Sequence, residues 1–350
     1  LALKQASGDF VTCHDADDWS HPEKIEIQAR RLMEKQDVLA NVSSWTRTTS
    51  DLKFYRRGNP GFYVQLNISS LMFRRKPLID NLGFWDSVRF GADTEFFKRI
   101  KKVWGNEAID EIPALLSFAR STETSLTENQ VFGYPGYPMG ARKEYQDSSL
   151  YYYKTHNKAS QLKYSFPQKS RPFPVPEVMW PNRELKTSGR RHFDVVIASD
   201  FRVWDESTQE LAQELNNLKG KKLRTGIAQM ADYDTEPDLT IDDSIREMVD
   251  GNCVQVIVYG EKIACDNLTV GKLSVLQEKQ QYVPDISASN VAVNADLSFT
   301  ENSHAIKRCV KHLRHYFGQA GVWYPADKNS SRMLTDIAKN ESLPITISNK

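Results

Sequence analysis

The stretch GDFVTCHDADDWSHPEKI, residues 8–25, decides the interpretation of the first half of the chain. A short apolar strand leads into an acidic turn, and Ser20 is then expected to cap a helix that has a proline near its start. Asp15, Asp17 and Asp18 stand within four residues at the end of the strand. Carboxylates this close repel one another unless a cation or hydrogen-bond donors neutralise them. The carboxyl end of a strand in an α/β sheet is also where ligands usually bind.

Three interpretations of the acidic turn compete. It is a solvated turn that caps the next helix, a calcium loop of the EF-hand type, or a divalent-cation site that also holds phosphate oxygens. Asp15, Asp17 and Glu26 do fall at the first, third and twelfth positions of a calcium loop. However, Trp19 stands at the fifth ligand position, and Ser20 replaces the glycine of the turn.

Composition is that of an ordinary globular protein. The chain has 350 residues, of which 40% are hydrophobic and 26% charged, and its length favours two domains. The 46 basic residues balance 45 acidic ones, so the net charge of +1 predicts neither nucleic acid nor an anionic membrane as a partner. No apolar run reaches the length of a membrane span. The four cysteines have no Cys-x-x-Cys spacing, so we expect buried free thiols rather than disulfides or zinc ligands.

A change of character divides the chain. Residues 165–191 contain five prolines and no periodic pattern, which predicts an extended linker. We therefore predict one domain at 1–164, a linker at 165–191 and a second domain at 192–350. In the second domain strands alternate with helices, which predicts a parallel sheet covered on both faces.

The expected elements follow from apolar periodicity and from Gly, Pro and Ser positions. Strands are expected at 9–13, 39–47, 70–73, 109–118, 193–198, 223–229, 254–259, 291–294 and 322–324. Helices are expected at 20–35, 79–83, 91–105, 141–158, 206–218, 241–249 and 303–317.

A second block of sequence supports the cation-site interpretation of the turn. It comprises SLMFRR at 70–75, LGFWD at 82–86 and GADTEFFKRI at 91–100. Together with GDFVTCHDADDW and the following Pro-Glu-Lys-Ile, this block resembles family 2 glycosyltransferases over residues 1–125. The resemblance implies the C-terminal portion of a GT-A domain whose base-binding strands would precede Leu1, so we expect this fragment alone to be inactive or impaired.

The resemblance also implies roles for the carboxylates. Asp17 would bind a divalent cation, Mn²⁺ or Mg²⁺, and Asp15 would contact the ribose or the metal. Asp18 would support the metal shell or the donor sugar. Asp93 matches the catalytic base of a direct, inverting displacement. Asp near a helix start is also commonly a cap, and Ala92 stands where many relatives carry Glu.

Further contacts to acceptor or phosphate are expected from the second block. The candidates are Glu95, Arg74, Arg75, Arg89 and Trp85. Surface arginine and core tryptophan are the alternatives for four of them. Glu95 would either replace the missing carboxylate of position 92 or face solvent.

The second domain resembles the Rossmann-like domains appended to some bacterial polysaccharide transferases, which look like half of a GT-B enzyme. No glycine-rich phosphate loop follows its first strand, at 193–198. His312 and His315 have a spacing of three on one helix but no matching Glu or Cys, so a metal pair is not expected. We expect an acceptor-positioning or assembly domain.

The sequence thus predicts a hexosyltransferase-type enzyme that uses a nucleotide-sugar donor and a glycan acceptor. We expect it to act in bacterial surface polysaccharide synthesis, in the cytoplasm and at the inner face of the membrane. A non-catalytic module that binds carbohydrate or nucleotide is the alternative, and a calcium-stabilised structural protein is the third hypothesis.

Overall fold

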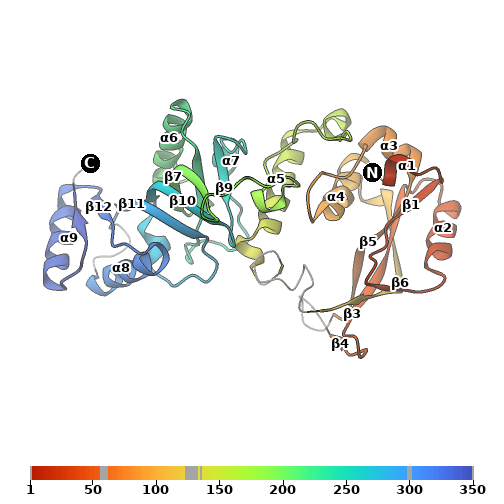
Figure 1. Cartoon of the computed structure of the whole chain (residues 1–350), viewed down its shortest axis with the longest axis horizontal. Helices are drawn as coiled ribbons and strands as arrows, with labels where there is room; N and C mark the ends of the chain where they lie inside the picture. Colours follow the sequence, from red (N-terminus) through yellow and green to blue (C-terminus); the bar gives the residue numbers. More distant parts are fainter. Residues whose placement is uncertain (1, 56–61, 123–132, 135, 298–301, 349–350) are drawn as a thin grey trace. The chain divides into compact units, whose positions relative to one another are not determined.

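A computed structural model describes residues 2–55, 62–122, 133–134, 136–297 and 302–348 (Figure 1). Its contacts divide the chain into two compact units. The first unit comprises Leu1–Asn129 and Tyr152–Pro172, and the second comprises Gln130–Tyr151 and Phe173–Lys350. The predicted α/β class, with a GT-A-type portion followed by a second α/β unit, is confirmed. The predicted domain limits stay a prediction, and the contact division differs from them by giving 130–151 to the second unit.

The first unit is built on a six-stranded mixed sheet with the order β1-β5-β3-β6-β2, and β4 pairs with β3. Strands β3 and β6 run parallel, whereas the other pairs are antiparallel. The strands are β1 (Phe10–Thr12), β2 (Trp19–Ser20), β3 (Ala40–Thr48), β4 (Phe54–Tyr55), β5 (Val64–Arg74) and β6 (Ile109–Arg120). The helices are α1 (Ala2–Gln5), α2 (Lys24–Glu34), α3 (Arg75–Leu82) and α4 (Ala92–Trp104), with short 3₁₀ turns η1 (Asn106–Ala108) and η3 (Ala159–Leu162).

The start of α2 differs from the prediction. Its N-cap is Glu23, without a side-chain cap bond, and the expected cap Ser20 lies in β2. Ser20 pairs with Ser117 of β6, so its backbone is extended, and its hydroxyl instead accepts from Lys24 Nζ at 3.3 Å. The prediction of Ser20 as a cap was wrong because Ser20 is part of a β-strand pair and lies before the start of the helix.

Helix α3 begins at Arg75, earlier than predicted, and stops at Gly83 as expected. Gly83 has φ of 72°, and a Cβ there would lie 2.0 Å from the carbonyl oxygen of Tyr164. Only glycine fits both the left-handed backbone and this close approach. Helix α4 buries Phe96, Phe97 and Ile100 as predicted.

The proline-rich segment packs more closely than an extended linker would. Phe173, Val175, Val178 and Met179 are buried. The 3₁₀ turn η4 (Glu177–Met179) interrupts the segment. Proline here shapes a packed segment whose backbone needs few hydrogen bonds.

The second unit holds a seven-stranded, wholly parallel sheet with the order β13-β12-β11-β10-β7-β8-β9. The strands are β7 (Arg191–Ser199), β8 (Thr225–Gln229), β9 (Val254–Ile257), β10 (Lys262–Val270), β11 (Asp285–Ala295), β12 (Val322–Pro325) and β13 (Thr346–Ile347). The helices and turns are η2 (Tyr137–Met139), α5 (Ala141–Thr155), α6 (Glu206–Gly220), α7 (Asp243–Arg246), η5 (Leu273–Leu276), α8 (Ser303–Phe317) and α9 (Lys328–Asn340). The contact division assigns the end of α5, from Tyr152, to the first unit.

The strand order reverses between β7 and β10. From β7 the chain steps to β8 and β9 in one direction, and from β10 it steps to β11, β12 and β13 in the other. Because parallel crossovers are right-handed, opposite steps put their helices on opposite faces. Figure 1 shows α6 and α8 on opposite sides of this sheet. The carboxyl ends of β7 and β10 therefore form the switch point at which such sheets bind ligands.

Within the described ranges, no helix combines the length and the apolar character needed to cross a bilayer.

Candidate functional site

The acidic turn connects β1 to β2. Asp15 and Asp17 are exposed, whereas Asp18 is half-buried. The carboxylate of Asp18 accepts a hydrogen bond of 3.0 Å from the backbone N–H of Arg120. Asp18 thus ties the turn to the end of β6 and leaves its two neighbours facing outward.

The electrostatics of the turn are those of crowded anions. Burial raises the pKa of Asp18, and the charges of Asp15 and Asp17 raise it further. Across the turn, burial lowers the pKa of Lys24, although Asp15 and Asp18 oppose that effect. Lys24 is 4% exposed. A buried ammonium therefore stands against a set of carboxylates that repel one another.

Asp93 lies in the first turn of α4, facing the same region. The N-cap of this helix is Gly91, which has φ of 83°, so Asp93 is not the cap. Burial raises the pKa of the Cys13 thiol, and Asp15 and then Asp93 raise it further, although the residue as a whole is exposed. The acidic turn and the helix N-terminus therefore lie within electrostatic reach of one thiol.

Glu95 has a different environment from Asp93. Its carboxylate is fully buried, 2.9 Å from Arg99 Nε and 2.5 Å from the donating Tyr153 hydroxyl. The alternative that Glu95 faces solvent was wrong. Arg99 also donates to the carbonyls of Leu82 and Phe84, so this pair holds α4 against the segment before it.

The predicted arginines and the tryptophan have mainly structural partners. Arg74 donates to the carbonyls of Leu32, Lys35 and Val38 at the end of α2, which is a C-capping role.

Arg75 donates to the carbonyls of Gly8 and Ser7. Trp85 packs on Phe73 and Phe96, as a core tryptophan does. Only Arg89 is exposed.

Sequence reasoning missed three residues beside the acidic turn, namely Cys13, Lys24 and Arg47. Arg47 is 7% exposed, its charge acts on Asp18, and its Nε has no hydrogen-bond partner among the described residues. Lys24 is part of the stretch 8–25, and its position in the first turn of the helix after the acidic turn could have indicated that it lies close to the carboxylates. Nothing in the sequence marks Arg47, which reaches the site from β3.

The turn fits a cation that phosphate helps to hold. No group of three His, Cys, Asp or Glu side chains suited to a metal occurs within the part of the chain that the structure describes. Mg²⁺ and similar ions commonly use one or two carboxylates together with substrate phosphates. The carboxylates of Asp15 and Asp17 are exposed and have no partner among the described residues, which matches that arrangement. A self-sufficient calcium cage would need more oxygen ligands.

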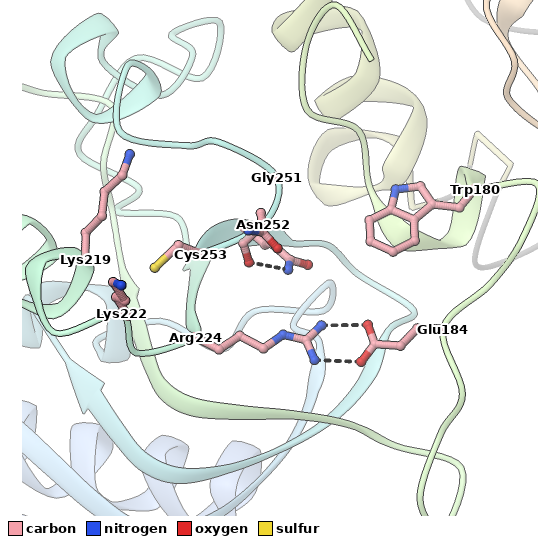
Figure 2. Close-up of a pocket in the computed structure, with 9 residues that line it drawn as sticks. Trp180, Glu184, Lys219, Lys222, Arg224, Gly251, Asn252 and Cys253 are labelled. Carbon is pink, nitrogen blue, oxygen red and sulfur yellow. Dashed lines mark hydrogen bonds and ion pairs between the residues drawn. The ribbon is translucent and has the colours of Figure 1, made fainter. Parts of the chain in front are cut away.

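Two cavities lined by described residues lie in the second unit. One, of about 670 Å³, lies at the amino ends of β8 and β9 (Figure 2). Figure 2 shows Arg224 joined to Glu184 by two bonds, each of 2.6 Å. Because this cavity lies at the amino edge of the sheet, it is the weaker candidate for a ligand site.

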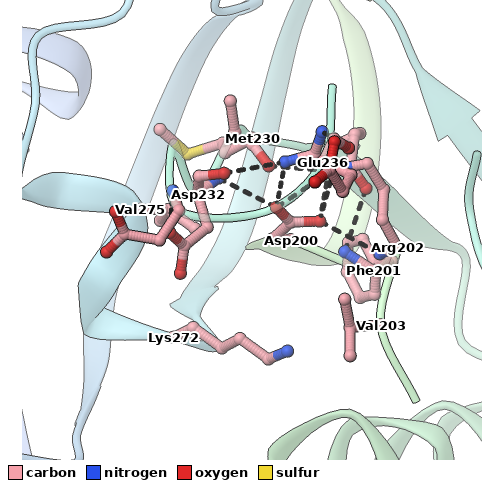
Figure 3. Close-up of polar contacts among 12 residues, drawn as sticks. Asp200, Phe201, Arg202, Val203, Met230, Asp232, Glu236, Lys272 and Val275 are labelled. Atoms are coloured by element: carbon pink, nitrogen blue, oxygen red, sulfur yellow. Dashed lines mark hydrogen bonds and ion pairs between the residues drawn. The ribbon is translucent and has the colours of Figure 1, made fainter. Parts of the chain in front are cut away.

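The other cavity, of about 630 Å³, lies at the carboxyl ends of β8 and β9. Next to it, Asp200 organises the loops after β7 and β8 (Figure 3). Its carboxylate accepts from Arg202 Nη2 at 2.6 Å, from Gln229 at 2.9 Å and from the backbone N–H of Asp232 at 2.8 Å. Burial alone would raise the pKa of Asp200, but these donors outweigh it and lower that pKa.

In α8, His312 has a structural partner. His312 is buried, and its Nδ1 lies 2.7 Å from the carbonyl oxygen of Leu276. All four cysteines are free, but Cys13 is exposed and Cys253 is only partly buried, in contrast to the expected burial.

Comparison with known families identifies the first unit. Residues 1–96 match the family model described as Glycosyl transferase family 2, and this range contains both the acidic turn and Asp93. No curated protein matches the chain. Residues 1–96 are therefore similar to glycosyltransferase family 2, whose members transfer sugars from nucleotide-sugar donors to acceptors, and this match supports a glycosyltransferase.

Proposed function

We propose that the first unit transfers a hexose from a nucleotide sugar to a saccharide acceptor, with inversion at the anomeric carbon. The observation that carries the proposal is that the stretch matching the family contains both the acidic turn and Asp93. The negative charges of Asp15 and Asp93 both act on the Cys13 thiol and raise its pKa. One carboxylate comes from the acidic turn and the other from a helix start about 80 residues later in the chain. A donor and an acceptor need such groups on two sides of one site.

Asp15 and Asp17 would hold Mn²⁺ or Mg²⁺, which neutralises charge on a departing diphosphate. Asp18 would support them through its bond to the Arg120 backbone. Lys24 and Arg47 supply two sheltered positive charges next to these carboxylates, suited to phosphate oxygens.

Asp93 would take the proton from an acceptor hydroxyl as that oxygen bonds to the anomeric carbon. The bond from this carbon to the diphosphate oxygen breaks, and its electron pair leaves with the diphosphate. Asp93 suits the base role because its carboxylate makes no hydrogen bond or ion pair with any residue that the structure describes.

Glu95, Arg74 and Trp85 have structural partners, so we assign them no substrate contact. Arg89 and Arg75 stay candidates for acceptor contacts. Four free thiols are typical of a reducing compartment, which supports a cytoplasmic site of action. The product that we propose is a bacterial surface polysaccharide.

Calorimetric titration of uridine, guanosine, cytidine, adenosine and thymidine diphosphates, with and without Mn²⁺, tests the donor site. The full-length protein should bind one of them in a Mn²⁺-dependent manner, and Asp17→Asn should abolish that dependence. Asp37→Asn is the matched control, because Asp37 is exposed and lies outside the turn. Absence of any nucleotide binding would contradict the proposal. The acidic turn would then be interpreted as a solvated turn that caps the next helix.

A non-catalytic module makes a different prediction. It would bind nucleotide or glycan but release no nucleoside diphosphate from any nucleotide sugar, and Asp93→Asn would then change nothing.

A further inference from the structure

The cavity of about 630 Å³ in the second unit has the size of a small-molecule site. It opens at the carboxyl ends of β8 and β9, with Val256, Ile257 and Val258 among its lining. Three segments far apart in the sequence complete it, namely 138–147, 231–241 and 279–284. All of them belong to the second unit.

Each of these segments is fixed by polar contacts. Arg202, itself held by Asp200, donates to the carbonyls of Asp232 and Glu236 and so fixes the loop after β8 (Figure 3). Gln280 fixes the 279–284 segment, because its amide exchanges two hydrogen bonds, of 2.8 and 3.0 Å, with the backbone of Ala231.

The 138–147 segment is fixed in the same way. Glu144 and Arg246 form a buried ion pair, and the backbone N–H of Tyr259 donates to the carbonyl of Met139 at 2.8 Å. Buried polar contacts of this kind cost stability if left incomplete, and all of these are satisfied. The cavity is therefore preformed, which lowers the entropic cost of binding a ligand.

The charges around the cavity balance. Its lining includes the basic residues Lys143, Arg202 and Lys279 and the acidic residues Glu144, Asp147 and Asp232. Lys143 pairs with Asp147 at 2.5 Å, and Arg202 pairs with Asp200 at 2.6 Å. A diphosphate needs an excess of positive charge or a helix N-terminus with free N–H groups. This lining supplies no such excess.

The remaining lining is apolar in large part, with Met139, Leu239 and Ile241 beside the β9 residues, and it also holds aromatic and neutral hydrogen-bonding groups. Tyr259 and Tyr282 pack edge to face at 5.2 Å between ring centroids, and Tyr233 is 61% exposed. Thr235 and Gln281 add a hydroxyl and an amide to the lining. Tyrosine combines a flat apolar face with a polar tip, which matches the C–H faces and hydroxyl groups of a sugar ring.

We propose that this cavity binds a neutral oligosaccharide, namely a segment of the acceptor glycan at a distance from its reacting end. The identification of that glycan as the acceptor rests on the proposed function, whereas saccharide binding by the cavity does not. The second unit would thus hold the chain to which the first unit adds a sugar.

Saturation-transfer NMR and calorimetry with neutral tri- to pentasaccharides of glucose, galactose and N-acetylglucosamine test this proposal on the full-length protein. At least one probe should bind, and Tyr233→Ala should weaken its binding about tenfold. Tyr63→Ala is the matched control, because Tyr63 is 52% exposed and lies in the first unit. Lys279→Ala, a second variant at an exposed position, should shift binding less than Tyr233→Ala.

The donor-site variant Asp17→Asn separates this proposal from the previous one. It should lose Mn²⁺-dependent nucleotide binding and retain saccharide binding. Failure of every saccharide to bind would overturn the cavity proposal even if nucleotide binding were normal. Uridine diphosphate binding that survives Asp17→Asn but is lost in Tyr233→Ala would also overturn it, because the cavity would then be a nucleotide site.

Discussion

Asp93 and Glu95 lie two residues apart on α4, yet their surroundings are opposite. Glu95 is fully buried against Arg99 and Tyr153, whereas Asp93 is partly exposed and is not the helix cap. The same contrast holds between the acidic turn of the first unit and the carboxyl edge of the second sheet, where Asp200 accepts from Arg202, Gln229 and the backbone.

This difference separates carboxylates that stabilise the fold from carboxylates that are available for catalysis or cation binding. A buried carboxylate that is paired with arginine holds two segments of the chain together. Its removal leaves the arginine charge buried without a partner, which destabilises the fold. A carboxylate without such a partner, close to others, costs the fold free energy and is available to a cation or a proton. Variants of the two kinds should therefore fail in different ways.

The largest effect is expected from Asp93→Asn. Loss of a general base should lower kcat for sugar transfer by about 10²- to 10⁴-fold, because the proposed mechanism gives the acceptor proton to Asp93. Nucleoside diphosphate binding should stay within about twofold, and the free energy of unfolding within about 0.5 kcal/mol. Release of nucleoside diphosphate from the donor in the presence of acceptor measures the rate. A matched control is Asp80→Asn, an exposed carboxylate on α3. Transfer at the normal rate by Asp93→Asn would show that the base is elsewhere.

Glu95→Gln should give the reverse result. Arg99 would keep its carbonyl partners but lose its counter-charge inside the protein, which should cost about 3–5 kcal/mol of unfolding free energy. Urea unfolding measures the loss, and activity per folded molecule should change little. The exposed pair of Arg30 and Glu26 is the control, since Glu26→Gln should cost at most about 1 kcal/mol. A stable but inactive Glu95→Gln would place Glu95 in the chemistry and break the contrast.

The sequence predicted the order of elements and the acidic turn because local signals carry both. Gly91 and Gly105 bracket α4, and apolar residues at helical spacing fill its buried face. The partner Tyr153 could not be predicted, since it meets Glu95 only through the fold, 58 residues along the chain. The alternative that Glu95 faces solvent was wrong for this reason.

Strand β10 is the clearest omission in the fold. It lies between β7 and β11 at the centre of the second sheet, yet Asp266 and Asn267 interrupt its apolar pattern. A central strand is expected to be nearly all apolar, so the pattern argued against it. Asn267 pairs in register with Asn290 of β11 and Val195 of β7, and the long parallel ladders stabilise the strand despite its polar residues. The switch point could not be predicted without β10.

The pH dependence of stability should also differ between the two kinds of carboxylate. In the second unit, hydrogen bonds from Arg224 hold the pKa of Glu184 down at about 2. A depressed pKa means that this carboxylate stabilises the fold above about pH 4.5, and that the contribution is lost as pH falls toward 2. Glu184→Gln should cost about 1 kcal/mol at pH 7, since solvent screens this partly exposed pair. The difference from the wild type should vanish near pH 2, as urea unfolding across that range measures. If the difference in unfolding free energy between variant and wild type were the same at every pH, the effect would come from packing and not from the charge of Glu184.

Asp18→Asn should produce the smallest effect, with the opposite sign. Burial and the neighbouring Asp15 and Asp17 raise the pKa of Asp18, so its neutral form is the one that the fold prefers. The wild type should be destabilised at pH values above the raised pKa, and this penalty should disappear below the unfolded value of about 3.9. Asp18→Asn should therefore raise the melting temperature slightly at pH 7 and leave it unchanged near pH 3. Added Mn²⁺ should stabilise the wild type more than the variant, because a cation relieves the same repulsion. A lower melting temperature for the variant at pH 7 would instead make Asp18 a scaffold carboxylate, held by its bond to the Arg120 backbone, and would move it to the paired side of the comparison.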